Sequence, residues 1–132
     1  PYAAVIPLFV KGILKETPLY INGDGEQTRD FTFVDNAVPV NVTGMLSSNA
    51  EAFNKVYNVA VGESATVNYL FDYCKKMLGS NFEATYREPR EGDIRDSLAD
   101  ISLAQNLLNY QPTKKFENGL EDTISFFKEL YS

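Results

Sequence analysis

The chain has 132 residues, of which 44% are hydrophobic, and this length suffices for one globular domain with its own core. A net charge of −6 without a basic stripe argues against nucleic-acid binding, and the absence of histidine excludes the common zinc sites and any His-activated nucleophile. The single cysteine, Cys74, cannot form an internal disulfide and is typical of a reducing compartment, so we expect a cytoplasmic protein.

The first apolar stretch, Tyr2–Leu14, contains Lys11 and is too short to span a bilayer, so we expect a helix and no membrane association. This helix is predicted to begin near Pro7, a residue favoured at the first helical position, and to stop at Thr17–Pro18. The residues predicted to face inward are Leu8, Phe9, Ile13 and Leu14. Leu19–Ile21 is then predicted to be a short strand that ends in an Asn-Gly-Asp-Gly turn.

The next two elements are a strand and a helix. Thr28–Val34 alternates and is rich in β-branched and aromatic residues, which indicates a second strand. Asp35 or Asn36 can cap a helix that runs to about Ser48. On this assignment Pro39 falls in the first turn of the helix, where proline is tolerated.

The middle of the chain predicts a strand, a helix and another strand. Val56–Val61 is typical of a buried strand, and Thr66 then caps a helix that ends at Gly79, a favoured carboxy-terminal cap. The apolar positions of this helix follow the helical period at Val67, Leu70, Phe71, Cys74, Met77 and Leu78. Phe82–Tyr86 is predicted to be a further strand.

The last third holds a polar stretch, Arg87–Ser97, followed by two helices. Asp100 is predicted to cap a helix that ends near Leu108. The final helix places its apolar residues on one face, at Leu120, Ile124, Phe127 and Tyr131. About five helices and four short strands indicate an α/β fold class with α+β character.

The four arginines are unevenly distributed in this acidic chain. Arg29 lies near a predicted strand end, and Arg87, Arg90 and Arg95 fall within nine residues, whereas the eight lysines are mostly scattered over helices. A guanidinium offers a planar fork of donors that matches two phosphate oxygens at once. The pattern indicates a small site for a phosphorylated ligand, although exposed ion pairs with neighbouring carboxylates would explain it equally well.

Four segments, in a consistent order, carry a family resemblance over nearly the whole chain. Tyr2–Pro7 matches the entry to a substrate domain, and Leu19–Asp35 matches a strand-turn-strand signature. Tyr57–Ala60 matches the next strand, and Arg90–Asp93 followed by Ala99–Asp100 matches a late substrate loop. With these segments the sequence is similar to the extended short-chain dehydrogenases that act on nucleotide sugars, and within them to UDP-hexose and UDP-N-acetylhexosamine 4-epimerases.

The resemblance implies that residues 1–132 form the carboxy-terminal, nucleotide-sugar-binding domain of such an enzyme. The amino-terminal Rossmann domain is absent from this chain, which begins at Pro1 with apolar residues, so we expect a fragment of a longer protein. Apolar surface that normally faces the missing half would then be exposed. We therefore expect self-association or a homodimer, through the first helix or an unpaired strand.

For the diphosphate of the UDP-sugar substrate, the resemblance implies that Arg29 and Arg90 bind the phosphate oxygens, in agreement with the preference of guanidinium groups. Asp93 would accept a hydrogen bond from a ribose hydroxyl or hold Arg90 in place. Arg87 and Arg95 are interpreted as surface charges.

The remaining implied contacts surround the two ends of the ligand. Three consecutive residues would pack and hydrogen-bond around the uracil and ribose: Tyr20, Ile21 and Asn22. Ala4 and Val5 would line the cleft for the sugar and nucleotide, where small side chains make room, although both would also suit a plain core. Ser97 matches a position that limits sugar size, and its small side chain leaves room for an N-acetylhexosamine.

The resemblance implies that the sugar is oxidised at C4 by hydride transfer to NAD, which gives a 4-keto intermediate. The hydride then returns to the opposite face of the sugar. The chain has no glycine-rich dinucleotide fingerprint. Its one Tyr-x-x-x-Lys match, Tyr110–Lys114, contains Pro112, which prevents the helical turn that the pair would need. We therefore expect no catalytic, NAD-binding or metal-binding residue here, NAD bound by the rest of the parent enzyme, and no activity from the chain alone.

Two alternatives stay open from the sequence. A nucleotide-sugar 4,6-dehydratase or decarboxylase of the same superfamily would share the diphosphate arginines. A non-catalytic domain that binds sugar nucleotides would also share them. The sequence before Pro1 separates these functions, because only the enzymes require a glycine-rich turn and a Tyr-x-x-x-Lys pair.

Overall fold

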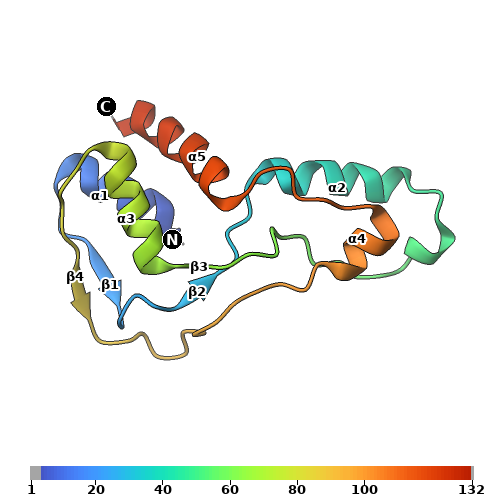
Figure 1. Cartoon of the computed structure of the whole chain (residues 1–132), viewed down its shortest axis with the longest axis horizontal. Helices are drawn as coiled ribbons and strands as arrows, with labels where there is room; N and C mark the ends of the chain where they lie inside the picture. The colour runs from blue at the N-terminus through green and yellow to red at the C-terminus, as the bar shows by residue number, and fades with distance from the viewer. Residues whose placement is uncertain (1–3, 132) are drawn as a thin grey trace.

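The computed structural model describes residues 4–131 and shows five α-helices and four short strands in this part of the chain (Figure 1). The helices are α1 (Val5–Lys15), α2 (Val34–Leu46), α3 (Val67–Leu78), α4 (Ser102–Leu108) and α5 (Phe116–Tyr131), with a short 3-10 helix η1 (Ala50–Ala52). The strands are β1 (Tyr20–Asn22), β2 (Thr28–Arg29), β3 (Ala65–Thr66) and β4 (Thr85–Arg87). The predicted α/β class is confirmed.

The described chain is elongated and has two lobes (Figure 1). The α1/α3/α5 lobe contains these three helices together with β1 and β4. The α2/α4 lobe contains α2, η1 and α4. The antiparallel pair formed by β2 and β3 lies between the two lobes, on segments that join them.

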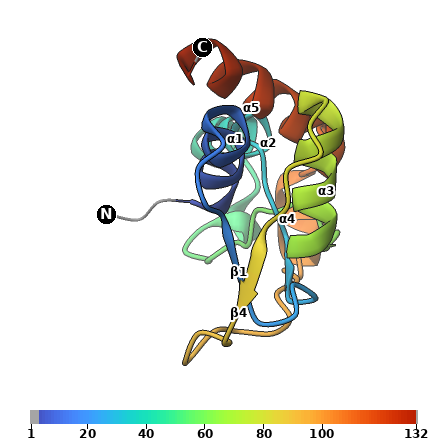
Figure 2. The same ribbon diagram turned by 90° about the vertical axis from the view of Figure 1, so that its left-hand side faces the viewer.

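The α1/α3/α5 lobe has the larger core. In both views α1 lies beside α3, with α5 close to them (Figures 1 and 2). Phe9 of α1 and Phe71 of α3 meet edge to face, with ring centroids 5.0 Å apart. Leu70 and Cys74 are completely buried in the same cluster. Burial raises the pKa of the Cys74 thiol to about 12, so this cysteine is a core residue, as its helical position predicted.

The ends of α3 follow from local sequence signals. The Thr66 hydroxyl accepts a hydrogen bond from the Tyr69 backbone N–H (3.0 Å) and caps the first turn. Gly79 adopts a left-handed conformation (φ 62°), and its N–H donates to the carbonyls of the last turn. Both predicted caps are confirmed.

The start of α1 differs from the prediction. The helix begins at Val5, two residues before Pro7. Leu8, predicted to face inward, is 47% exposed, whereas Val10 is fully buried. A helix places Phe9, Val10 and Ile13 on one face, and Leu8 lies outside that arc.

The α2/α4 lobe has a smaller core, formed around Val40, Ala60, Ala104 and Leu108. At the entrance to α2, neither predicted cap is found, because the helix begins at Val34 after Phe33 and no side chain caps it. Pro39 therefore lies in the helix interior rather than in the first turn.

Asn36, one of the two predicted caps of α2, is instead a buried hydrogen-bonding residue. Its side-chain oxygen accepts from the backbone N–H groups of Thr113 (2.9 Å) and Lys114 (3.0 Å). Its amide donates to the Lys114 carbonyl oxygen (2.7 Å). The side chain thus joins the start of α2 to the segment that leads into α5.

The predicted strand Val56–Val61 is wrong. The segment is not in a strand ladder with any described residue, and Val56 is 91% exposed. Side chains hold it instead: the Tyr110 hydroxyl donates to the Ala60 carbonyl oxygen (2.7 Å), and Asp30 accepts from the Val61 N–H (3.0 Å). A strand needs a neighbour to pair with, and within residues 4–131 this segment has none.

Three smaller corrections concern other predicted elements. The predicted strand Thr28–Val34 is limited to Thr28–Arg29, and the one at Phe82–Tyr86 is shifted to Thr85–Arg87. Asp100 precedes α4 as predicted, but its carboxylate accepts from the Ser102 N–H (2.9 Å) while Ile101 occupies the cap position.

Candidate functional site

A polar hollow of about 450 Å³ lies where β1 and β4 end. The two strands are parallel, with Asn22 in register with Arg87, so their carboxyl ends meet at the same edge. The hollow is lined by the turn Asn22–Asp24, by Gln27, and by two pieces of the following loop, Arg87–Arg90 and Asp93–Arg95. Crevices at the carboxyl ends of parallel strands are common ligand sites in α/β proteins.

Backbone hydrogen bonds join the late loop to the turn. The Gly23 N–H donates to the Arg87 carbonyl oxygen (2.8 Å), and the Thr28 N–H donates to the Arg95 carbonyl oxygen (2.8 Å). Gly25 adopts φ 76°, and a Cβ there would lie 1.9 Å from the Asn68 side-chain oxygen. Only glycine suits this position, so the shape of the turn follows directly from the sequence.

Arg29 and Arg90, predicted to bind one diphosphate, come from β2 and from the loop that follows β4. Arg90 lines the hollow. Arg29 lies next to it, and its terminal nitrogen Nη2 contacts the Asp93 carboxylate, which also lines the hollow, at 2.5 Å. The side chain of Asp93 thus holds Arg29 rather than Arg90, to which it is linked only by its backbone N–H (3.1 Å).

Arg87 and Arg95, interpreted from the sequence as surface charges, both line the same hollow. Arg95 forms an exposed two-nitrogen contact with the Asp24 carboxylate, with distances of 3.0–3.2 Å. A backbone hydrogen bond from Glu26 and then the guanidinium of Arg95 lower the pKa of Asp24. The clustering of three arginines within nine residues was the signal for this site, and the sequence interpretation used only one of them.

Arg87 is held differently, by uncharged groups. Its Nε donates to the Asn22 side-chain oxygen (2.6 Å), and its guanidinium carbon lies 5.1 Å from the ring centroid of Tyr20. Asn22 and Tyr20 are both predicted ligand contacts, so the structure places Arg87 directly beside two of them.

The other predicted site residues lie outside the hollow. Ala4 and Val5 stand at the amino end of α1, where Val5 packs against the main core. Ile21 is buried in that core with 1% exposure. Ser97 follows the hollow along the chain, and its N–H donates to the Thr28 hydroxyl at the long distance of 3.4 Å.

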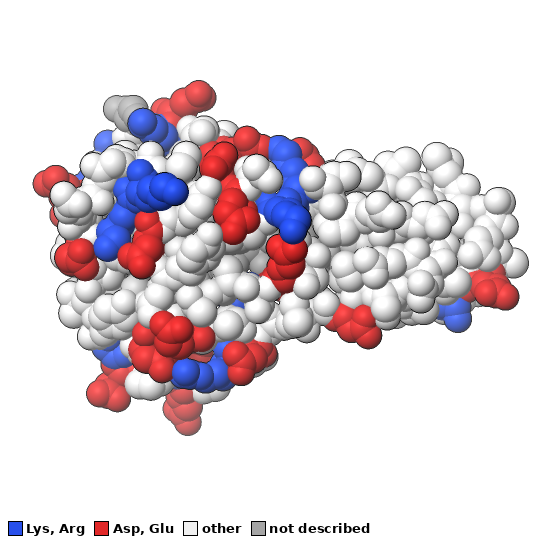
Figure 3. Space-filling model, in the orientation of Figure 1, with Lys and Arg blue, Asp and Glu red and all other residues white. Residues whose placement is uncertain are grey.

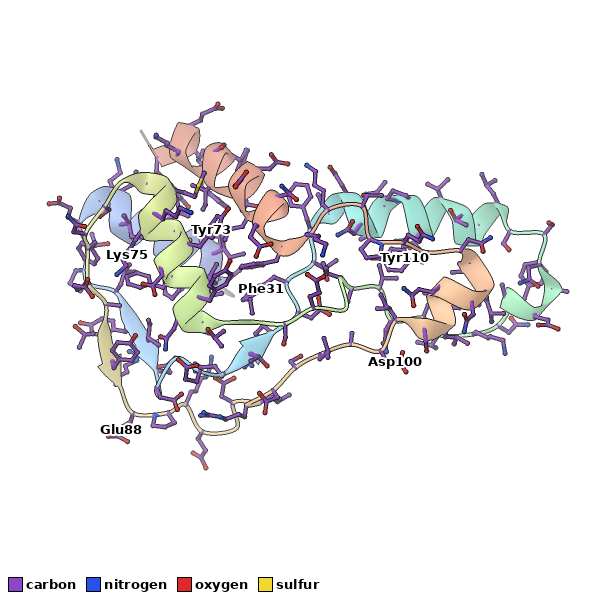
Figure 4. All side chains as sticks on the ribbon, in the orientation of Figure 1. Phe31, Tyr73, Lys75, Glu88, Asp100 and Tyr110 are labelled. Atoms are coloured by element: carbon purple, nitrogen blue, oxygen red, sulfur yellow. The ribbon has the colours of Figure 1, made fainter. Side chains whose placement is uncertain are left out.

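On the face shown in Figure 3, charged side chains gather on the α1/α3/α5 lobe and are sparse on the α2/α4 lobe. The hollow belongs to the charged lobe, at the end of β4 where Figure 4 labels Glu88. In the part of the chain that the structure describes, no group of His, Cys, Asp and Glu residues could hold a metal ion. None of the helices in that part is both long and apolar enough to cross a membrane.

The Tyr110–Lys114 pair is not a catalytic dyad. Tyr110 lies on the non-helical segment between α4 and α5 (Figure 4), as Pro112 predicted, and its buried hydroxyl is committed to the Ala60 carbonyl oxygen. Burial raises the pKa of Tyr110, whereas a tyrosine that acts as a base needs a lowered one. Lys114 instead contacts the carboxylates of Asp35 and Asp122.

Comparison with known proteins gives a family match over most of the chain. Residues 2–123 match the family described as GDP-mannose 4,6 dehydratase. Among curated relatives, UDP-glucuronate 4-epimerase of Thermodesulfobacterium geofontis is 31% identical over 122 residues, which are 92% of this chain and 36% of that protein. The chain spans less than two fifths of the length of the first curated relatives that it matches.

Solved structures agree with this match. UDP-glucose 4-epimerase of Thermotoga maritima, solved with UDP-glucose, has a TM-score of 0.91 and 33% identity, covering 100% of this chain and 41% of that one. UDP-N-acetylglucosamine 4-epimerase of Methanobrevibacter ruminantium M1, in complex with UDP-N-acetylmuramic acid, has a TM-score of 0.87 and 40% identity, covering 98% and 41%. UDP-glucuronic acid 4-epimerase of Bacillus cereus, solved with UDP-glucuronic acid and NAD, has a TM-score of 0.88 and 31% identity, covering 97% and 40%.

Proposed function

Because this chain belongs to the GDP-mannose 4,6-dehydratase family of extended short-chain dehydrogenases, we propose that residues 1–132 form the nucleotide-sugar-binding domain of a UDP-sugar 4-epimerase. The preferred substrate is a UDP-N-acetylhexosamine. The enzyme interconverts gluco and galacto sugars, and this domain contributes ligand binding rather than bond making.

The observation that carries this proposal is the meeting of two distant arginine segments at one hollow. Arg29 and Arg90 are 61 positions apart in the chain, and Asp93 contacts Arg29 with its side chain and Arg90 with its backbone N–H near the carboxyl ends of β1 and β4. Two guanidinium groups near one polar hollow suit the paired phosphates of a nucleotide sugar. Ion pairs account for Arg29 and Arg95, whereas Arg90 lines the hollow without a carboxylate partner among residues 4–131.

Binding of the diphosphate requires Arg29 to change partners. Its contact with Asp93 is about one third exposed on both sides, so solvent screens it and little free energy is lost when it opens. Once Arg29 turns to a phosphate oxygen, the carboxylate of Asp93 becomes available to a ribose hydroxyl. Asn22 lines the same hollow and Tyr20 lies beside Arg87, and we assign both to the base and ribose end of the ligand.

The preference for an N-acetylated sugar rests on the small side chain of Ser97. Ser97 does not line the hollow itself but follows it along the chain. The 40% identity to a UDP-N-acetylglucosamine 4-epimerase supports this sugar class over a plain hexose.

NAD, which the family relationship implies, does not fit the residues of this chain. The chain offers no glycine-rich turn between a strand and a helix, and its one Tyr-x-x-x-Lys pair is used structurally. We therefore assign NAD binding and proton transfer to the part of the full-length protein outside these 132 residues. The chain alone is expected to be inactive.

A nucleotide-sugar 4,6-dehydratase is the second candidate, because the matching family carries that description. The hollow described above would serve either reaction equally. Product analysis separates them: an epimerase returns an isomer of the supplied sugar, whereas a dehydratase releases water and leaves a 4-keto-6-deoxy sugar.

The test is calorimetric titration of UDP-N-acetylglucosamine and UDP-glucose into the full-length protein. Arg29→Ala and Arg90→Ala are each expected to weaken binding about tenfold or more, since each removes a charge-assisted contact. Lys55→Ala, an exposed charge change in the other lobe, serves as control. Unchanged affinity in both arginine variants would show that this hollow is not the ligand site.

Ser97→Tyr tests the sugar assignment separately. The bulky ring is expected to suppress turnover of the N-acetylated sugar while sparing the plain hexose. Equal loss for both sugars would show that Ser97 does not limit sugar size.

A further inference from the structure

Arg87 stands at the position where the two parallel strands open the hollow. It is the last residue of β4 and lies in register with Asn22, the last residue of β1. Its backbone carbonyl accepts from the Gly23 N–H, so the main chain at this point is fixed to the turn. The Arg87 side chain therefore lines the hollow at the carboxyl end of β4.

The guanidinium group of Arg87 is held by two neutral partners. Nε donates to the Asn22 side-chain oxygen at 2.6 Å, and the guanidinium lies over the Tyr20 ring at 5.1 Å. An arginine has five N–H donors, so the four donors on its two terminal nitrogens stay available for a ligand. Because two contacts already limit its rotamers, little side-chain entropy is lost when a ligand binds.

The charge of Arg87 is not neutralised within the described residues. In the same region Arg29 is paired with Asp93, and Arg95 is paired with Asp24. No carboxylate of residues 4–131 lies within 4.0 Å of a guanidinium nitrogen of Arg87 or Arg90. The lining itself carries three arginines and three carboxylates, and Arg29 beside it pairs with Asp93, so the group that includes Arg29 keeps one net positive charge.

We propose that Arg87 is a third nucleotide-sugar-binding arginine, which donates from its terminal nitrogens to phosphoryl oxygens of the ligand alongside Arg90. The proposal rests on the proposed function, because it assigns the phosphates of the UDP-sugar to this hollow. On this proposal Asn22 and Tyr20 also position the Arg87 guanidinium, in addition to their proposed contacts with the base and ribose.

Binding to the full-length protein tests the proposal, with UDP and inorganic pyrophosphate as probes. Arg87→Met is expected to weaken the binding of both probes about tenfold, because a charge-assisted contact to a phosphate is lost in each. Arg87→Lys keeps the charge but loses the fork, so it should fall between wild type and Arg87→Met.

Two variants with the same change of charge calibrate these losses. Lys55→Met, in the other lobe, should leave affinity within twofold of wild type. Arg95→Met should weaken binding less than Arg87→Met, because Asp24 already compensates its charge. Equal losses of affinity for Arg95→Met and Arg87→Met would show that long-range charge explains the loss. That result would overturn the proposed contact between Arg87 and the phosphoryl oxygens.

The two probes distinguish a phosphate contact from an indirect role. Pyrophosphate has no base or ribose, so a variant that weakens UDP but not pyrophosphate would show that Arg87 acts through Asn22 only. Arg87→Met with wild-type affinity for both probes, while Arg90→Ala weakens them, overturns this inference and leaves the proposed function intact. Failure of the wild-type protein to bind UDP overturns the proposed function itself.

Discussion

The two lobes bury their apolar side chains to different extents. In the α1/α3/α5 lobe three helices enclose a continuous core, with Leu70, Val10 and Cys74 fully buried. In the α2/α4 lobe the core is smaller, and a row of apolar side chains along α2 is exposed: Val34, Val38, Val42, Met45 and Leu46. On the face shown in Figure 3, this lobe also carries few charges.

From this difference we infer that the two lobes contact different kinds of partner. A charged surface around a polar hollow is suited to a small anionic ligand. An uncharged surface with exposed apolar side chains marks a place where another protein surface packs. We propose that the α2/α4 lobe faces the remainder of the full-length protein, which is consistent with a chain that spans about two fifths of its structural relatives.

The same substitution in each lobe tests this difference in burial most directly. Leu70→Ala is expected to cost about 2–5 kcal/mol of unfolding free energy, because it leaves a cavity in a closed core. Leu46, on the α2/α4 lobe, is 79% exposed, so Leu46→Ala should cost less than about 0.5 kcal/mol in the 132-residue chain. Urea unfolding followed by circular dichroism measures both values.

Measuring Leu46→Ala in the full-length protein tests whether α2 is covered there. If the remainder of the protein covers α2, Leu46→Ala becomes a buried substitution there and should cost more than about 1 kcal/mol. A cost that stays near zero in the full-length protein would contradict the proposed contact between α2 and the missing half.

The second prediction concerns the polar residue that joins α2 to α5. Asn36 is 2% exposed and makes hydrogen bonds to Thr113 and Lys114. Asn36→Ala is expected to cost about 3 kcal/mol, because it leaves two backbone N–H groups and a carbonyl without partners. Asn41→Ala removes an exposed amide from the same helix and should change stability by less than about 0.5 kcal/mol. Similar costs for the two variants would show that the Asn36 contacts do not connect the lobes.

The third prediction tests the exposed segment of the α2/α4 lobe as a contact between copies. The 132-residue chain is expected to self-associate, and Val56→Lys should weaken association about fivefold, because it puts a charge in place of a strongly exposed apolar side chain. Leu8→Lys tests the alternative contact through α1 in the same way. Sedimentation that shows only monomer at the highest attainable concentration would rule out self-association.

Sequence patterns predicted most reliably the features that depend on nearby residues. The caps of α3 at Thr66 and Gly79 were predicted correctly, because a cap is made within one turn of its own helix. Val56–Val61 failed because an apolar, β-rich segment becomes a strand only beside another strand. Pro39 was placed in the first turn because the start of α2 carries no capping side chain to mark it.

In the candidate site, too, features set by nearby residues were predicted and features set by distant residues were not. The cluster of Arg87, Arg90 and Arg95 was visible in the sequence, and the family resemblance selected Arg90 from it together with the distant Arg29. Arg87 could not be placed at the hollow from the sequence, because its position depends on the register with Asn22, a residue 65 positions away. Contacts of this length are set by the packing of the whole lobe rather than by local patterns.

The smallest expected effect concerns pH and the closed core of the α1/α3/α5 lobe. Tyr73 on α3 lies on the side of α5 (Figure 4), and its hydroxyl donates to the Glu121 carboxylate at 2.6 Å. This hydrogen bond, together with burial, raises the pKa of Tyr73 to about 12, from an ordinary value near 10. The neutral phenol is therefore the form that the folded state prefers.

The sign of the pH dependence follows from that preference. A pKa raised by folding contributes stability that is fully present below pH 10 and is lost as the pH rises through about 12. Tyr73→Phe removes the titrating group, so its unfolding free energy should fall less between pH 10 and 12 than that of wild type. Glu121→Gln keeps an acceptor without the charge and should shift the pKa of Tyr73 back toward 10, as followed by phenolate absorbance. Identical pH dependence in wild type and Tyr73→Phe would show that this hydrogen bond does not stabilise the contact between α3 and α5.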